Sequence, residues 1–213
     1  MRQIELTFSV KGRGGAREGA GRKPLPVGQR HTPHRARAKH RARHPVHVTL
    51  RAASRSLRSQ QVVKTVLGAL HASNCEGFRI AHYSVQHNHI HLIAEAEDER
   101  SLSSAMRSLA IRIALRVNRL LFRRGRFWAD RWHGHTLTTP REVRHALRYA
   151  LQNHRKHGSF GAALDPLSSA QWFDGFAQPL PSTFESIGPP AVATPKTWLL
   201  KVGWRRHGLI QIS

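Results

Sequence analysis

Acidic residues are scarce in this chain. Its 213 residues include 12 Asp and Glu against 35 Lys and Arg, which leaves a formal net charge of +23 with histidine neutral. A large positive field would remain even if every acidic group found a partner, and such a field attracts a polyanion. Nucleic acid is the expected polyanion, because phosphate neutralisation by Lys and Arg supplies most sequence-independent affinity. An anionic membrane surface is the competing partner, but no free-standing basic helix with a strong apolar face stands out.

Cysteine and long apolar runs are also nearly absent. The single Cys75 excludes an internal disulfide and a cysteine-rich zinc module. The longest apolar runs fall far short of the roughly 20 residues that span a bilayer. The first residues contain no continuous apolar region and no small-residue cleavage site, so no secretory signal is expected. We therefore expect a soluble protein with one core, located in the cytoplasm and associated with the nucleoid.

Large apolar side chains are missing from residues 11 to about 44, which are rich in Gly, Pro, Arg and His. Such a segment cannot bury enough surface to fold, so residues 1–43 are predicted to form a basic flexible arm. The piece GAGRKP resembles the Gly-Arg-Pro core of an AT-hook, which would place Arg22 and Lys23 in a DNA minor groove. The composition alone would also explain an arm that seeks phosphates without specificity.

The ordered domain is expected over residues 44–158. Val46, Val48 and Leu50 alternate with polar residues, which is typical of a half-buried strand. The other expected elements are a helix over 59–73, strands over 77–85 and 89–96 that form a hairpin, and a long amphipathic helix over 101–127. A last helix begins with a capping box of Thr139 and Glu142 and has its stop signal at Gly158.

This order predicts an α+β fold with a ferredoxin-like antiparallel sheet and helices on one face. Residues 159–213 form a Pro-rich C-terminal extension, which is rich in loops. Its last part, TWLLKVGWRRHGLIQI, carries enough apolar mass to dock on the domain.

Two histidines share one side of the strand over 89–96. His89 and His91 point to one face and Ile90 and Leu92 to the other, because side chains alternate along a strand. If the apolar face takes the helices, the histidines look outward and are close enough to share one divalent metal. The alternative is a merely polar strand face, since the chain has 16 histidines. His87 has the same parity but lies at the turn.

A second pair of polar residues lies on the last helix. Tyr149 and Asn153 are four residues apart and so share one helix face. Taken singly, Tyr149 would be a ring packed at the core edge and Asn153 a solvated residue.

Together these motifs resemble the single-tyrosine HUH transposases, in particular the REP-associated tyrosine transposases of bacteria. The resemblance covers residues 44–158 and rests on HNHIHLI, the arginine-rich helix and REVRHALRYALQNHRKHG. It implies an HUH endonuclease-like fold, in which His89, His91 and Asn153 bind a metal and Tyr149 is the nucleophile. It also implies Mg²⁺ or Mn²⁺, although two histidines alone suit Mn²⁺ or Zn²⁺ at least as well.

The activity that this resemblance implies is metal-dependent nicking and rejoining of single-stranded DNA near hairpins or palindromic repeats, through a 5′-phosphotyrosine. Members often pair as dimers, and whether Tyr149 acts in its own protomer is left open.

Basic side chains with stacking aromatics suit unpaired strands. The predicted DNA-binding residues of this region are Arg112, Arg116, Arg119, Arg123, Arg124, Arg126 and Trp128. Trp128 and Trp132 are equally interpretable as core or lid residues.

Three other functions stay open. The first is a hairpin-binding protein of the same fold that has lost cleavage. The second is a metal-dependent nuclease that uses water, with Glu95 as a further ligand on the same strand face. The third is a structural ribosome-associated protein, which fits the charge but does not explain why the histidine strand and the tyrosine helix occur together.

Overall fold

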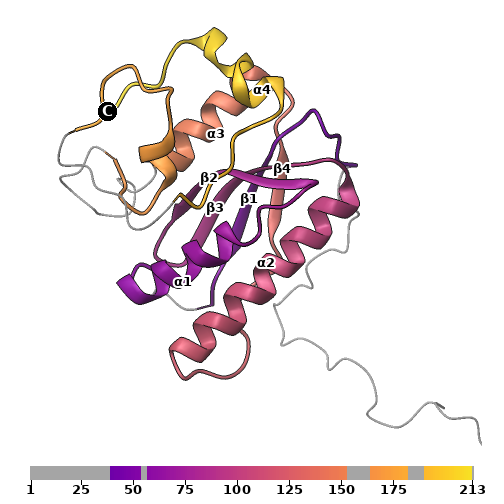
Figure 1. Cartoon of the computed structure of the whole chain (residues 1–213), viewed down its shortest axis with the longest axis vertical. Helices are drawn as coiled ribbons and strands as arrows, with labels where there is room; N and C mark the ends of the chain where they lie inside the picture. The colour runs from indigo at the N-terminus through magenta and orange to yellow at the C-terminus, as the bar shows by residue number, and fades with distance from the viewer. Residues whose placement is uncertain (1–38, 54–56, 153–163, 182–189, 213) are drawn as a thin grey trace, which may run out of the picture. The chain divides into compact units, whose positions relative to one another are not determined.

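The computed structural model describes residues 39–53, 57–152, 164–181 and 190–212. Lys39–Ser213 form one compact unit. Its centre is a four-stranded antiparallel sheet with the strand order β2-β3-β1-β4 (Figure 1). The strands are β1 (Val46–Arg51), β2 (Phe78–Val85), β3 (His89–Ala96) and β4 (His133–Thr136). The predicted α+β fold with a ferredoxin-like antiparallel sheet is confirmed.

The strands β2 and β3 form the predicted hairpin, but its register contains a bulge. Ile80 pairs with Ala94 and His82 pairs with Ile93, so Ala81 is an extra residue on β2. A bulge of this kind changes which side of the strand the following residues face. The even-numbered Phe78 and Ile80 before the bulge and the odd-numbered Tyr83 and Val85 after it therefore belong to the same core.

Helices cover both faces of the sheet. The helices α1 (Gln60–His71) and α2 (Glu99–Leu120) pack on one face, while α3 (Pro140–Gln152) lies on the other (Figure 1). The expectation of helices on one face only is wrong. Its physical reason lies in β3, where Ile90 and Leu92 enter one core and Ile93 enters the second. The strand is apolar at positions of both parities, and each apolar face needs a cover.

The helix α2 begins as its sequence suggests but ends earlier than predicted. Its N-cap Asp98 accepts a hydrogen bond from the Ser101 backbone N–H at 2.6 Å, which stabilises the first turn. The last helical residue is Leu120, and Phe122 follows with a positive φ of 50°. A residue in this left-handed conformation ends an α-helix.

The predicted capping box at the start of α3 is present. Thr139 Oγ1 accepts a hydrogen bond from the Glu142 N–H at 3.2 Å, and Glu142 Oε2 accepts one from the Thr139 N–H at 3.0 Å. Thr138 donates to the same carboxylate from its N–H and its hydroxyl. These bonds lower the pKa of Glu142 below its usual value, with the Thr138 N–H as the largest cause. The predicted stop at Gly158 lies outside the described residues.

The C-terminal extension packs on the same face as α3, as the apolar content of its last part predicts. It contains η2 (Ser169–Trp172), α4 (Trp198–Lys201) and η3 (Gly203–His207). Leu199, Leu200, Trp204 and Ile210 are buried against α3 and β3, whereas Trp198 and Leu209 stay exposed. Arg144 of α3 donates to the carbonyls of Gly208 and Leu209, which ties the helix to the extension.

A buried histidine at this junction makes stability depend on pH. Burial lowers the pKa of His82 to about 4, and Ser169 Oγ lies 3.2 Å from its Nδ1. The unfolded chain, with a histidine pKa near 6.5, binds this proton first as the pH falls. The stability that neutral His82 contributes is therefore complete above about pH 6.5 and is lost as the pH falls towards about 4.

We expect His82→Leu to weaken this dependence. Between about pH 7.5 and 4.5, wild type should lose about 2–3 kcal/mol more of its free energy of unfolding than the variant does. Urea unfolding at both pH values, followed by tryptophan fluorescence, measures the difference. Equal losses in the two proteins would show that His82 is protonated in the folded state as readily as in the unfolded one.

Candidate active site

The two histidines of β3 lie under the layer that contains α3. The ring centroids of His89 and His91 are 4.7 Å apart, and the rings are nearly perpendicular at 83°. His91 is only 4 % exposed and His89 is half-buried. The expectation that both look outward is wrong for His91, because α3 and the extension cover this face of the sheet.

The neighbouring strand β1 adds two side chains that the sequence interpretation did not include in the site. Thr49 pairs with His91 across the sheet, and Thr49 Oγ1 lies 3.2 Å from His91 Nδ1. His47 Nε2 lies 3.3 Å from the same nitrogen. Both residues have the strand parity that points to this face. The signal was visible in HPVHVTLRA, but using it requires knowing that β1 pairs with β3 and in which register.

Tyr149 of α3 stands over this cluster. Its ring centroid is 4.9 Å from that of His91 and 5.7 Å from that of His47, and both contacts are edge-on. The buried stripe of α3 sets this position, since Ala146, Leu147 and Ala150 face the core and leave Tyr149 at the edge of the helix interface. The phenol is 37 % exposed, so a ligand from solvent can reach it. Asn153, predicted to be the third metal ligand, lies outside the described residues.

His47 is neutral in this arrangement. Burial, with a smaller contribution from the nearby His135, lowers its pKa to about 4. A neutral imidazole can accept a hydrogen bond from the N–H of its neighbour. His47 can therefore accept a bond from His91 Nδ1–H, which leaves His91 Nε2 as the nitrogen with a lone pair.

The histidine pair has the chemistry that a divalent metal needs. Asn88 Oδ1 lies 2.7 Å from His89 Nδ1, and Thr49 and His47 contact His91 Nδ1, so each ring is oriented from one nitrogen. Histidines that bind metals are generally held in this way, with the other nitrogen towards the ion. Among the described residues, no three His, Cys, Asp or Glu side chains are grouped to hold a metal. The two imidazoles fit a divalent metal site as two of its ligands, and such a site needs at least one further donor.

Glu95 has another role in the described structure. Its carboxylate accepts hydrogen bonds from the N–H groups of Lys196 and Thr197 and from the Thr197 hydroxyl, at 2.7–2.9 Å. Arg79 lies 3.5 Å from the same carboxylate. Glu95 therefore fixes the start of α4, and these bonds leave it poorly placed to be the extra ligand of a water-using nuclease.

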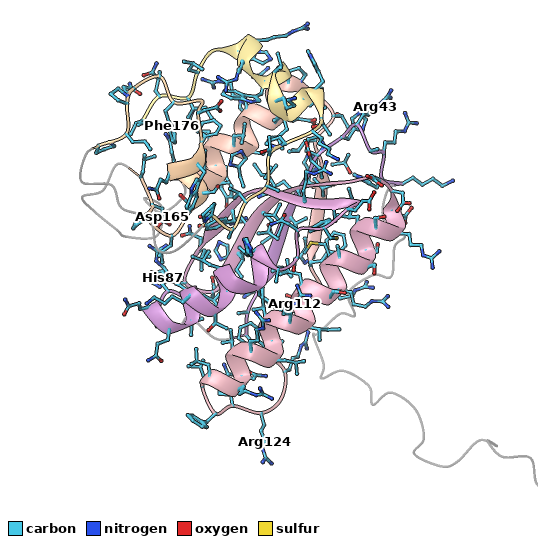
Figure 2. The ribbon with its side chains drawn as sticks, in the orientation of Figure 1. Arg43, His87, Arg112, Arg124, Asp165 and Phe176 are labelled. Atoms are coloured by element: carbon cyan, nitrogen blue, oxygen red, sulfur yellow. The ribbon has the colours of Figure 1, made fainter. Side chains whose placement is uncertain are left out.

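Three arginines of the DNA-binding prediction lie on the opposite face of the sheet from Tyr149. Arg112 (Figure 2), Arg116 and Arg119 belong to α2, which packs against Ile90 and Leu92. Arg126 donates to the carbonyls of Trp128 and Ala129. The Trp128 indole is half-buried and donates to Ala110 O at 2.9 Å. Arg22 and Lys23 lie outside the described residues, and DNA binding by this whole set stays a prediction.

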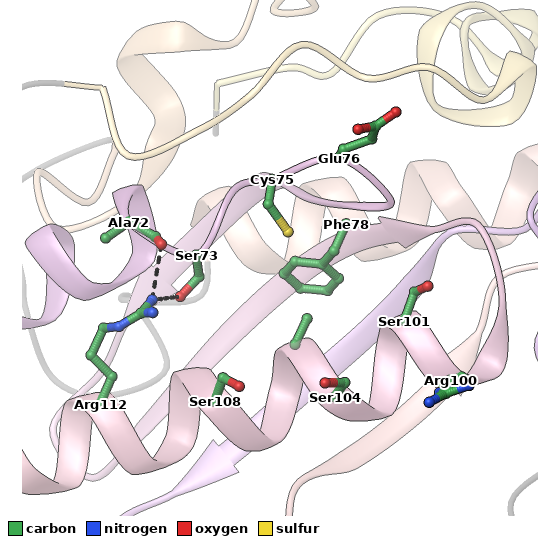
Figure 3. A pocket seen from close by; sticks show the side chains of 11 residues that line it. Ala72, Ser73, Cys75, Glu76, Phe78, Arg100, Ser101, Ser104, Ser108 and Arg112 are labelled. Atoms are coloured by element: carbon green, nitrogen blue, oxygen red, sulfur yellow. Dashed lines mark hydrogen bonds between the residues drawn. The ribbon is translucent and has the colours of Figure 1, made fainter.

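Arg112 lines a cavity of about 460 Å³ between α2 and the α1–β2 connection (Figure 3). Its guanidinium donates to Ala72 O at 2.9 Å and to Ser73 Oγ at 2.6 Å, which joins α2 to the end of α1. The cavity also contains Ser104, Ser108 and Cys75, and none of the proposed active-site residues lines it. Arg112 thus has a structural role whatever it binds.

Comparisons with known proteins identify the family and the fold. Residues 41–152, just over half of the chain, match the family model described as "Transposase IS200 like". The chain also resembles a solved structure described as a REP-associated tyrosine transposase bound to a REP hairpin, with a TM-score of 0.53 and 18 % sequence identity. That similarity covers 66 % of this chain and 84 % of the other. The search of curated proteins found no match. Within the described residues, no helix is long and apolar enough to cross a membrane.

Proposed function

Because the chain belongs to the IS200-like transposase family, we propose that it nicks single-stranded DNA beside hairpins and rejoins the strands, with Tyr149 as the nucleophile. Membership of this family indicates a DNA-processing enzyme, and the family is generally metal-dependent. The observation that carries the proposal is the placement of an accessible tyrosine ring 4.9 Å from the ring of a strand histidine of the same chain. We therefore assign Tyr149 to its own protomer's site.

Each residue of the proposed site has a separate role in the reaction. Tyr149 Oη attacks the phosphorus and loses its proton, while the bond to the 3′ oxygen breaks and that oxygen is released as a hydroxyl. The product is a 5′-phosphotyrosine, which keeps the phosphodiester energy for rejoining. His89 and His91, with Asn153, would hold Mg²⁺ or Mn²⁺. When held there, the ion would supply Lewis-acid withdrawal of charge from the scissile phosphate.

The residues around His89 and His91 support these roles. Thr49 and His47 keep the His91 ring in one orientation through their contacts at Nδ1. The covering α3 layer excludes water from one side of the cluster, which strengthens electrostatic interactions there. The nearby DNA hairpin is proposed by analogy with the REP hairpin of the similar solved structure.

The test is covalent trapping. The full-length protein is incubated with end-labelled single-stranded DNA that contains a hairpin and with Mn²⁺ or Mg²⁺, and the products are separated on denaturing gels. We expect a labelled band at the mass of protein plus DNA. DNA cleavage without that band would favour the water-using nuclease, and tight binding without cleavage on a panel of hairpins would favour the binding-only relative.

The same assay tests the metal ligands. His89→Ala and His91→Ala should each lower the nicking rate by at least about 100-fold, because each removes an imidazole that orients the ion. EDTA should abolish nicking by wild type. The matched control is His87→Ala, which removes an exposed histidine at the turn before β3 and should change the rate by less than about twofold. Equal losses in all three variants would contradict a metal site at the β3 pair.

A further inference from the structure

Phe122 occupies an unusual position at the end of α2. Its side chain is 98 % exposed, and it is the one non-glycine residue with a positive φ in the described part of the chain. The Phe122 N–H donates to Arg119 O and the Arg123 N–H donates to Asn118 O, which is the Schellman pattern of a helix C-terminus. Glycine usually takes this position, because the left-handed conformation is unfavourable for other residues. The ring buries almost no surface here, so packing of the fold does not explain an aromatic residue at this position.

The turn that carries Phe122 is held by several bonds. Asn118 Nδ2 donates to Gly125 O at 3.1 Å, and Gly125 itself has a φ of 90°. Arg126 Nε donates to Trp128 O at 2.6 Å, which fixes the next part of the chain. The backbone that carries the exposed ring is therefore held in a defined place, which lowers the entropy cost of binding.

The surface around the ring is strongly basic. No acidic residue occurs between Arg100 and Asp130 in the sequence. The α2 residues Arg107, Arg116 and Arg119 are exposed. Arg124, beyond the end of the helix, is exposed as well (Figure 2). This charge is complementary to a polyanion.

The other aromatic residues of this region pack within the protein. Phe127 is 3 % exposed and Trp132 is 9 % exposed, so both belong to the core. Trp128 packs edge-on against Phe127 and bonds to α2 through its indole N–H. Of the four aromatic residues between 122 and 132, only Phe122 presents an open face to solvent.

We propose that Phe122 is a stacking platform for an unpaired base of single-stranded DNA, whose phosphates contact Arg119, Arg123 and Arg124. This surface lies at the C-terminal end of α2, the helix that covers the sheet face opposite Tyr149, so it is a second DNA contact apart from the nicking site. The choice of DNA as the polyanion rests on the proposed function. Every base has an apolar face, so one aromatic ring with flanking cations binds unpaired strands with little sequence preference.

Substitution of Phe122 by glycine separates this role from folding. Phe122→Gly relieves the left-handed backbone, so the thermal midpoint should rise by about 2–4 °C. The same variant should weaken binding to an unpaired oligonucleotide of about 15 nucleotides by at least about fivefold. Phe122→Leu, which keeps an apolar side chain but lacks a ring, should weaken binding to a similar degree. Phe122→Trp should bind within about twofold of wild type.

Fluorescence anisotropy with the full-length protein in EDTA measures these affinities without nicking. A blunt duplex of the same sequence serves as the second probe and should bind all variants within about twofold of one another, since its bases are already stacked. Leu115→Ala is the matched control, because it removes another exposed apolar side chain from α2. Its affinity for the single strand should stay within about twofold of wild type.

Several outcomes would overturn the inference. These are single-strand binding by Phe122→Gly that equals wild type, a loss that the duplex shares equally, or no single-strand binding by wild type. Vesicles of phosphatidylserine serve as a third probe. If Phe122→Gly binds these vesicles more weakly than wild type but binds the single strand equally well, the surface would be assigned to a lipid instead. This outcome can be distinguished from failure of the proposed function. Phe122-dependent binding without any covalent adduct would contradict only the nicking activity. A covalent adduct together with unchanged single-strand binding by Phe122→Gly would contradict only this inference.

Discussion

Tyr149→Phe is expected to abolish the covalent protein–DNA product and to lower DNA nicking by at least about 1,000-fold. The variant loses only the phenolic oxygen, which is the attacking atom, and keeps the ring that packs against His47 and His91. The affinity for hairpin DNA should change by less than about twofold, because the basic surface and the fold are unaltered. Denaturing gels measure the adduct, and anisotropy measures the affinity.

The chain supplies its own control for this prediction in its only other tyrosine. Tyr83 is 1 % exposed in the core between the sheet, α1 and α2, and burial raises the pKa of its phenol above the usual value. A phenol that cannot reach DNA or ionise cannot act as a nucleophile. Tyr83→Phe should therefore keep the covalent adduct. An adduct that persists in Tyr149→Phe would require another nucleophile, and peptide mapping of the adduct would identify it.

Asp165→Ala is expected to have the largest effect on stability, about 3–5 kcal/mol in the free energy of unfolding. Asp165 is fully buried and accepts two hydrogen bonds from the Arg58 guanidinium at 2.8 and 2.9 Å. It also accepts bonds from Gln86 Nε2 and from the Leu167 N–H. The substitution leaves the mostly buried guanidinium with its bond to Val85 O but without a counter-charge. The penalty for breaking a buried pair in this way exceeds the value of the pair itself.

A second ion pair in the C-terminal extension provides the comparison. Asp174 lies 2.7 Å from Arg205, but its side chain is 86 % exposed. Asp174→Ala should therefore cost no more than about 1 kcal/mol, since solvent screens exposed pairs. Urea unfolding followed by tryptophan fluorescence measures both variants. Similar costs for the two would mean that Asp165 is not an important link between the extension and the sheet.

The position of Asp165 also connects stability to the active site. Gln86 ends the β2 side of the turn that leads into His89, and its N–H donates to the His89 carbonyl at 2.8 Å. Asp165 holds the side chain of Gln86 at 3.2 Å. We expect part of the nicking activity of Asp165→Ala to be lost at temperatures where the variant is still folded, because this turn sets the start of β3.

The amino-acid sequence determined those features that depend on short-range spacing. The alternation in HNHIHLI placed His89 and His91 on one side of a strand, and the capping box located the start of the helix that carries Tyr149. The order of the elements was sufficient to predict the antiparallel α+β fold. Such patterns follow from backbone geometry, in which side chains repeat every second residue in a strand and every three to four in a helix.

Only the tertiary structure decided which distant residues meet. His47 and Thr49 reach His91 because β1 pairs with β3 in one particular register, and no local pattern specifies that register. The second apolar layer turned His91 from an expected surface residue into a buried one, since the cover of a sheet face depends on segments more than a hundred residues apart. The core on the other face of the sheet buried Phe127 and Trp132, whereas Phe122 stayed exposed, although all three look alike in the sequence, because burial depends on the whole fold rather than on residue type.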